Sequence, residues 1–389
     1  MLISPASRRT TTAYSYAHRA VLLASIVHVL GAPAMARAAA ASPSKSGSSR
    51  QQTSYGSSSA AAGRAAKQTE TAQASELAEA KSFLQKGLLA EAEKATRQFL
   101  HSHADSAEGH YILGHILFDE VREKYVGEEK KEGENFRYSD TVDNPLVTMR
   151  DAKARESLAE LSAGARYRAP GALDLKIVGL DYLLLKDLPS AEKWLTASTT
   201  LNPKDEQTWF YLGRTKYSQT KYSSAIEAFQ HCLKLDPRNP TAEYNVGLSF
   251  EGLNQNDEAI QAYQNAIAWQ EQNETKSPDS LVGLARLYLR QNQPENALPY
   301  LLQAVAAFPE LSLAHEELGK AFSVLRRLHE AQEQLEKAVQ LSPQKAPLRC
   351  LLGQVYQQEK MTAKAQSEFE RCTALRTSES QPAGVNQTH

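Results

Sequence analysis

The chain has 389 residues, of which 41% are hydrophobic and 23% charged, and its formal net charge is −1. This apolar content is enough for a buried core and excludes a wholly disordered chain, and the lack of any run of about 20 apolar residues argues against a polytopic membrane protein. The charge is an average of two unlike parts, because residues 1–69 carry eight cations and no Asp or Glu, whereas residues 70–389 carry 36 cations and 45 anions. Neither the total nor the acidic body favours a nucleic-acid partner.

The first 36 residues have the anatomy of a secretory signal peptide. A cationic start precedes an apolar run over residues 20–31, and the small residues Ala34 and Ala36 suit signal-peptide cleavage. We therefore expect an exported protein, periplasmic or secreted, from which residues 1–36 have been removed. An uncleaved signal that anchors the chain in a membrane and an organelle-targeting peptide remain alternatives, since the segment is rich in Arg and Ser and lacks acids.

Residues 37–72 are rich in Ser and Ala, and Tyr55 is the only large hydrophobic residue between residues 42 and 71. Such a segment cannot bury enough apolar surface to offset its ordering entropy, so we expect a disordered linker there. The same composition argument predicts a disordered tail over residues 380–389.

The body of the chain, residues 73–379, repeats with a period of 34. In the clearest copy, residues 206–239, Gly213 stands at position 8, Ala225 at position 20 and Phe229 at position 24. Each copy contains two stretches of about 13 residues with apolar spacing near 3.6, which predicts two amphipathic helices. Small residues at positions 8, 20 and 27 let the two helices approach closely, and a Pro at position 32 ends the second helix.

This pattern resembles the tetratricopeptide repeat (TPR) family, and together with the leader it resembles exported bacterial members of that family. The resemblance implies an all-α fold, a right-handed superhelical α-solenoid of helix-turn-helix repeats that must stack to bury their apolar faces. We expect eight repeats, at residues 73–106, 107–168, 172–205, 206–239, 240–273, 278–311, 312–345 and 346–379.

The second repeat contains an insertion of 28 residues between its helices, at about residues 120–150. Its charged centre, residues 127–134, is most simply a solvated loop. Tyr125, Phe136 and Tyr138 are too apolar for a purely solvated segment, so a flap folded against the binding surface is an alternative.

No nucleotide-binding, hydrolase or metalloprotease motif is present, and we expect no catalytic residue, cofactor or metal. Four of the ten histidines cluster at His101, His103, His110 and His115. Metal binding requires ligands that converge in tetrahedral geometry, and these positions favour packing or solvent roles instead.

The three cysteines contain no CxxC pair. Cys232 and Cys372 fall at position 27, where a free thiol acts as a compact apolar residue. A bridge between Cys350 and Cys372 is compatible with an oxidising compartment, but position 5, where Cys350 stands, usually faces the binding groove, and this disfavours the bridge.

In TPR proteins the first helices line a concave groove through positions 2, 5, 6, 9, 12 and 13. Carried over to this sequence, those positions give the partner-binding residues Phe210, Tyr211, Arg214, Tyr217, Tyr244, Asn245, Arg286 and Arg290. Aromatic residues interleaved with Arg are typical of interaction hot spots. Leu180 and Tyr211 stand where chaperone-tail receptors of the family carry Asn, so the carboxylate clamp of those receptors is absent.

These features predict a non-catalytic scaffold that binds a peptide or protein partner in the groove, with cell-envelope assembly as the narrower expectation. The mature chain is expected to contain no integral membrane span. One alternative is a structural protein that self-associates through the solenoid ends into a homo-oligomer. A more distant one is an enzyme whose site is built by residues 120–150.

Overall fold

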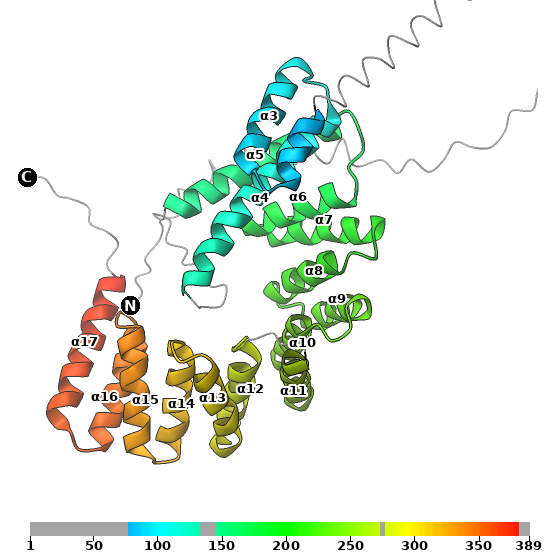
Figure 1. Cartoon of the computed structure of the whole chain (residues 1–389). Coiled ribbons are helices and arrows are strands. Elements are labelled where there is room, and N and C mark those ends of the chain that lie inside the picture. Colours follow the sequence, from blue (N-terminus) through cyan, green and yellow to red (C-terminus); the bar gives the residue numbers. More distant parts are fainter. Residues whose placement is uncertain (1–76, 133–144, 273–276, 381–389) are drawn as a thin grey trace, which may run out of the picture. The chain divides into compact units, whose positions relative to one another are not determined.

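The computed structural model describes residues 77–132, 145–272 and 277–380, and these residues form helices and turns without any strand (Figure 1). The predicted signal peptide, the whole predicted linker, residues 381–389 of the predicted tail, and Phe136 and Tyr138 lie outside the described residues. A first helix covers residues 77–85. It is followed by α3 (Leu89–Ser102), α4 (Ala107–Glu132), α5 (Pro145–Ala165), α6 (Ala172–Leu184), α7 (Leu188–Leu201), α8 (Glu206–Ser218), α9 (Tyr222–Leu235), α10 (Pro240–Gly252), α11 (Asn256–Gln272), α12 (Asp279–Arg290), α13 (Pro294–Ala307), α14 (Ser312–Val324), α15 (Leu328–Leu341), α16 (Ala346–Gln358) and α17 (Thr362–Ser380).

Consecutive helices pack in antiparallel pairs, which confirms the predicted all-helical fold. The tightest pairs are α6 with α7, α8 with α9, α10 with α11, α12 with α13, α14 with α15, and α16 with α17. The chain divides into two compact units. The described part of the first comprises residues 77–131 and 145–202, and that of the second lies mainly in residues 203–272 and 277–380.

Glycine at position 8 sets the distance between the paired helices. A Cβ atom added to Gly213 would lie 2.6 Å from the ring of Phe229. The same atom on Gly179 would lie 2.6 Å from Leu195. Because real Cβ atoms almost never approach other atoms so closely, the residue at position 24 packs directly on the glycine backbone, as the repeat pattern predicts.

The turns between paired helices share one backbone feature, a residue in the left-handed region. At Thr220 φ is 61°, and the next residue closes the turn, since the Lys221 N–H donates to the Lys216 carbonyl at 2.9 Å. This is the hydrogen bond of a Schellman cap, which usually employs glycine. The corresponding residues with positive φ are Lys186, Thr220, Asn254, Asn292, Arg326 and Lys360.

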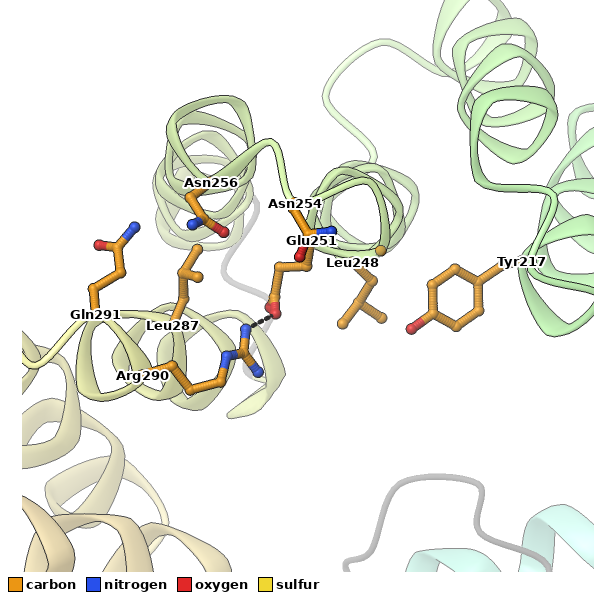
Figure 2. Close-up of a pocket in the computed structure, with 9 residues that line it drawn as sticks. Tyr217, Leu248, Glu251, Asn254, Asn256, Leu287, Arg290 and Gln291 are labelled. Carbon is orange, nitrogen blue, oxygen red and sulfur yellow. Dashed lines mark hydrogen bonds and ion pairs between the residues drawn. The ribbon is translucent and has the colours of Figure 1, made fainter.

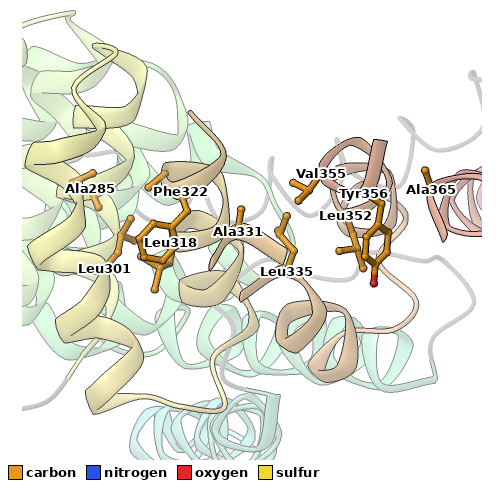
Figure 3. Packing of buried hydrophobic residues seen from close by; sticks show 12 residues of the cluster. Ala285, Leu301, Leu318, Phe322, Ala331, Leu335, Leu352, Val355, Tyr356 and Ala365 are labelled. Atoms are coloured by element: carbon orange, nitrogen blue, oxygen red, sulfur yellow. The ribbon is translucent and has the colours of Figure 1, made fainter. Parts of the chain in front are cut away.

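The core of the second unit is a series of side chains that interdigitate from one repeat to the next. Figure 3 shows Leu301 and Leu318 side by side, with Leu335, Leu352 and Tyr356 continuing the series toward α17. All of these side chains are buried. Each hairpin therefore buries its apolar face against its neighbours, as expected for stacked repeats.

The insertion differs from its sequence-based interpretation. Residues 127–132 were expected in a solvated loop, but α4 continues through them to Glu132, and α5 begins as early as Pro145. Glu and Lys are good helix formers, so a charged segment can extend a helix instead of ending it. Proline suits the first position of α5, because its missing N–H has no partner there in any helix.

The cysteines also require a correction. The structure contains a disulfide between Cys350 of α16 and Cys372 of α17, although the groove-facing position of Cys350 argued against it. The two Cα atoms are 5.4 Å apart, within the range that a disulfide spans. Position 5 is only half-buried here, so Cys350 contacts the second helix of its own repeat as well as the open face.

None of the helices in the described ranges combines the length and the apolar character that a membrane crossing requires.

Candidate functional site

A cavity of about 320 Å³ lies on the first helices of the second unit. Leu248 of α10 and Leu287 of α12 supply its apolar wall, and Figure 2 shows Tyr217 pointing from α8 toward them. Three side-chain amides stand at its edge, from the turns and helix ends after α10 and α12. The lining residues are Tyr217, Leu248, Glu251, Gly252, Asn254, Asn256, Leu287, Arg290 and Gln291.

Glu251 is the fixed polar group of this cavity. Its Oε1 atom accepts a hydrogen bond from the Tyr263 hydroxyl at 2.7 Å, and its Oε2 atom forms an ion pair with Arg290 (Figure 2). The Glu251 side chain is 14% exposed and that of Arg290 is 55% exposed. The carboxylate is therefore held from beneath by a buried tyrosine, while the guanidinium reaches into solvent at the mouth.

Tyr217 provides a neutral hydroxyl on the opposite side. Its ring packs on Tyr222 with centroids 5.5 Å apart. Burial raises the pKa of Tyr217, and the neighbouring Tyr222 and Glu251 raise it further. The hydroxyl thus keeps its proton at neutral pH and is available both as a donor and as an acceptor.

The predicted partner-binding residues divide into those that line the cavity and those that do not. Tyr217 and Arg290 line it. Arg286, one turn before Arg290 on α12, lies with its Nε atom 3.5 Å from Glu317 of α14 and is half exposed. The Asn245 amide donates to the Thr241 carbonyl at 2.7 Å.

Two of the predicted aromatic residues pack largely between helices. The Phe210 ring lies 5.9 Å from that of Phe229 and meets Tyr211 edge-on at 5.8 Å. Tyr244 packs against Tyr263 at 5.5 Å, and burial raises its pKa. These side chains contribute to the core as well as to the surface. Arg214, also predicted to bind a partner, is half-buried on α8.

Sequence reasoning missed most of the cavity lining. Leu248 and Glu251 occupy positions 9 and 12 of their repeat, so the positional rule that selected Arg290 contained a signal for them. Asn254, Asn256 and Gln291 lie beyond the first helices or at their ends, and no groove position of the family pattern includes them.

The clustered histidines have separate partners. His110 Nδ1 lies 2.6 Å from Glu160, and His115 Nε2 lies 2.8 Å from Asp174. His103 Nδ1 is 3.2 Å from the Phe99 carbonyl. Across the residues that the structure describes, no three His, Cys, Asp or Glu side chains are grouped as metal ligands.

Comparison with family models decides the classification. Three models described as tetratricopeptide repeat match residues 239–310, residues 77–123 with 282–365, and residues 206–239, which together cover more than half of the chain. The chain belongs to the tetratricopeptide repeat family. TPR repeats are protein-binding scaffolds and are typically non-catalytic.

Curated relatives match parts of this TPR array. The PEX5-related protein of Mus musculus is 32% identical over 98 residues, which is 25% of this chain and 17% of that protein. The DnaJ homolog subfamily C member 7 homolog of Schizosaccharomyces pombe is 28% identical over 180 residues, 43% of this chain and 38% of that protein. The chain thus spans less than half the length of each relative.

Among solved structures, that of PilW, described as a widely conserved type IV pilus biogenesis factor, is 17% identical to this TPR chain. It covers 54% of this chain and 98% of its own, with a TM-score of 0.47.

Proposed function

We propose that the second unit of this TPR protein binds an extended segment of a partner protein along α8, α10 and α12. The cavity beside the Glu251–Arg290 pair receives one residue of that segment. The observation that carries the proposal is the carboxylate–guanidinium pair at the mouth of a cavity of about 320 Å³, whose lining is mostly polar and includes Leu248 and Leu287 as its aliphatic part. Fixed polar groups in a concave site set the orientation of a ligand.

The chemistry of the lining favours an uncharged polar group in the cavity. Glu251 and Arg290 neutralise one another, and the remaining polar groups are the Tyr217 hydroxyl and the amides of Asn254, Asn256 and Gln291. Amides offer donors and acceptors side by side, and so does a peptide backbone. An extended chain with a neutral polar side chain matches this set, whereas a net charge would lose its hydration without a counter-ion.

Export is a further part of the proposal. The signal-like leader and the Ser/Ala-rich linker support a mature scaffold tethered or released outside the cytoplasm, and a role in envelope assembly would follow from that location. Fusing residues 1–72 to a reporter enzyme that folds only where disulfides form tests the location. A mature N-terminus at Arg37, read by mass spectrometry, supports it, and an intact Met1 chain inside the cell contradicts it.

The alternative of self-association through the solenoid end gains little support from α17. The described residues of α17 include no large hydrophobic side chain with high exposure. The alternative of an enzyme gains none from the cavity, because its carboxylate is already engaged by Arg290 and Tyr263.

The binding proposal is tested with peptides selected from a random displayed library against the mature chain. Arg290→Ala is expected to weaken the selected peptides about tenfold, because it leaves the Glu251 carboxylate in the cavity without its counter-ion, and a lost hydrogen bond to a charged group is worth about 1.5 kcal/mol or more. Arg286→Ala is the matched control, because it removes the same side chain one turn away and outside the cavity, and it should change affinity less than twofold. Equal loss in both variants, or loss in neither, contradicts the cavity assignment.

A further inference from the structure

The last described helix, α17, packs against one other helix within the described residues. Each earlier second helix of this unit, α9, α11, α13 and α15, packs against the first helix of its own repeat and also against the first helix of the next. Within the described residues, α17 packs against α16 alone. Among the described helices, α17 therefore has about half of the neighbours that stabilise the earlier second helices.

Three of the contacts between α17 and α16 stand out. The Phe369 ring packs on Gly353, where an added Cβ atom would lie 2.8 Å from the ring. Arg349 Nη1 lies 2.9 Å from Glu368, and the two side chains are only 13% and 11% exposed. The third contact is the disulfide between Cys350 and Cys372.

A matched cysteine elsewhere in the chain shows why this pair differs. Cys232 of α9 occupies the same repeat position as Cys372, and both are 1% exposed. The residue at the position of Cys350 is Phe210 in that repeat, so Cys232 faces no second sulfur. Cys232 is a free thiol, and burial raises its pKa to about 11, which leaves little reactive thiolate at neutral pH.

We propose that Cys350 and Cys372 form an oxidation site whose bridge keeps α17 folded on α16. The oxidant is a disulfide, either in a protein thiol oxidase or in oxidised glutathione. The bridge does not depend on the binding of a peptide at Arg290, which lies on another helix.

The order of the two steps follows from exposure. Cys350 is half-buried and Cys372 is almost fully buried, so Cys350 is the sulfur that a disulfide donor reaches first. The Cys350 thiolate attacks one donor sulfur, and the other donor sulfur leaves as a thiolate. The Cys372 thiolate then attacks Cys350, and the remaining donor sulfur leaves. Two protein thiols are oxidised, and one donor disulfide is reduced to two thiols.

The expected size of the effect follows from the loop that the bridge closes. The two cysteines are 22 residues apart. A disulfide that closes a loop of about this length disfavours the state in which α17 has unfolded from α16 by on the order of a hundredfold.

The experiment uses the mature chain incubated with oxidised glutathione, unfolded in denaturant and titrated for thiols. One thiol per chain is expected before reduction and three after it, and Cys232→Ala should lower these numbers to none and two. Three thiols in the oxidised parent chain overturn the assignment. So does the Cys232→Ala variant if it retains thiols after oxidation.

Hydrogen–deuterium exchange tests the role of the bridge. Reduction should accelerate exchange in peptides from α17 up to about a hundredfold and leave those from α9 unchanged. Cys350→Ser should give the fast exchange without reductant. If the bridge forms but its reduction leaves the exchange of α17 unchanged, the proposal that the bridge holds this helix is overturned. This outcome would not affect the peptide-binding test.

Discussion

The Oδ2 atom of Asp181 lies 2.6 Å from the Oγ atom of Ser157 in the interior of the first unit. The same Ser157 Oγ lies 2.9 Å from the carbonyl oxygen of Gly114. A serine hydroxyl has one proton and donates to one acceptor at a time. Both contacts are satisfied when Asp181 is protonated, because the carboxylic acid then donates to Ser157 and Ser157 donates to Gly114. This chain of hydrogen bonds joins α6, α5 and α4.

The first prediction concerns the pH dependence that Asp181 creates. Asp181 has no exposed surface, and its burial raises its pKa well above the ordinary value, against the opposing effect of the Ser157 hydrogen bond. Because the pKa of Asp181 is higher in the folded chain than in the unfolded one, its contribution to the stability of the first unit is complete below the unfolded pKa of about 3.9. This contribution is lost as the pH rises through the pKa of the folded chain.

Asp181→Asn is expected to stabilise the first unit at pH 8 by about 1–3 kcal/mol, because an amide donates to Ser157 as the acid does and never ionises. Hydrogen exchange of peptides from α4 to α6 between pH 5 and 8, corrected for intrinsic rates, measures the effect. Adding Ser157→Ala removes the acceptor and should abolish the gain. An Asn variant that is less stable at pH 8 would show that Asp181 is ionised in the folded chain.

The second prediction has the opposite sign and concerns Glu316 of α14. Burial alone would raise the pKa of this carboxyl, but Lys320 at 2.6 Å and Lys345 at 2.9 Å more than offset it, and the pKa is lowered. A lowered pKa contributes stability above the unfolded value and loses it as pH falls through the folded one. Acidification below about pH 4.3 should therefore weaken the second unit.

Glu316→Gln is expected to destabilise the second unit by on the order of 1 kcal/mol at pH 7, since both lysines are about one-third exposed and solvent screens them. The variant should also flatten the acid limb of the stability profile. Glu310→Gln is the control, because Glu310 pairs with Lys337 at 3.3 Å but is 74% exposed, and it should have almost no effect. Equal effects in urea unfolding would contradict the role of burial.

The third prediction tests the close approach of α8 and α9. Gly213→Ala should destabilise the second unit by about 1–2 kcal/mol, because the new methyl group overlaps the fully buried Phe229 ring and a helix-propensity gain of about 1 kcal/mol only partly offsets the strain. A leucine at the position of Phe229 would still crowd the new methyl group, as Leu195 does at Gly179, whereas Phe229→Ala removes the overlapping ring and should relieve the strain. If the destabilisation of the double variant equals the sum of the destabilisations of the two single variants, the overlap is not the cause.

The 34-residue period predicted the helix pairs because the constraint it encodes is local. A glycine or alanine faces a large residue 16 positions later within one hairpin, and only one packing of two short helices satisfies that pattern, as Gly213 with Phe229 and Gly179 with Leu195 show. The insertion was interpreted less well, since charge alone does not distinguish a solvated loop from a solvated helix.

The candidate site was harder to predict, because repeat position fixes the face of a helix but not the partner of a side chain. Arg286 and Arg290 both stand at groove positions, yet Glu317 engages one and Glu251 the other, and only Arg290 lines a cavity. Ion pairs between repeats depend on three-dimensional distances that a positional rule does not contain. The same is true of the approach of Cys350 to Cys372 within a single repeat.

The fourth prediction concerns Thr220, which closes the turn between α8 and α9 with φ at 61°. A β-branched residue in the left-handed region costs about 1–2 kcal/mol, whereas asparagine is tolerated there, and it occupies the same turn position at Asn254 and Asn292. Thr220→Asn should therefore stabilise the second unit by about 0.5–1 kcal/mol. Asn292→Thr is the reciprocal change and should cost a similar amount. The midpoint of urea unfolding measures both, and the explanation by backbone strain fails if the two substitutions shift the midpoint in the same direction, because they exchange the same two side chains between equivalent turns.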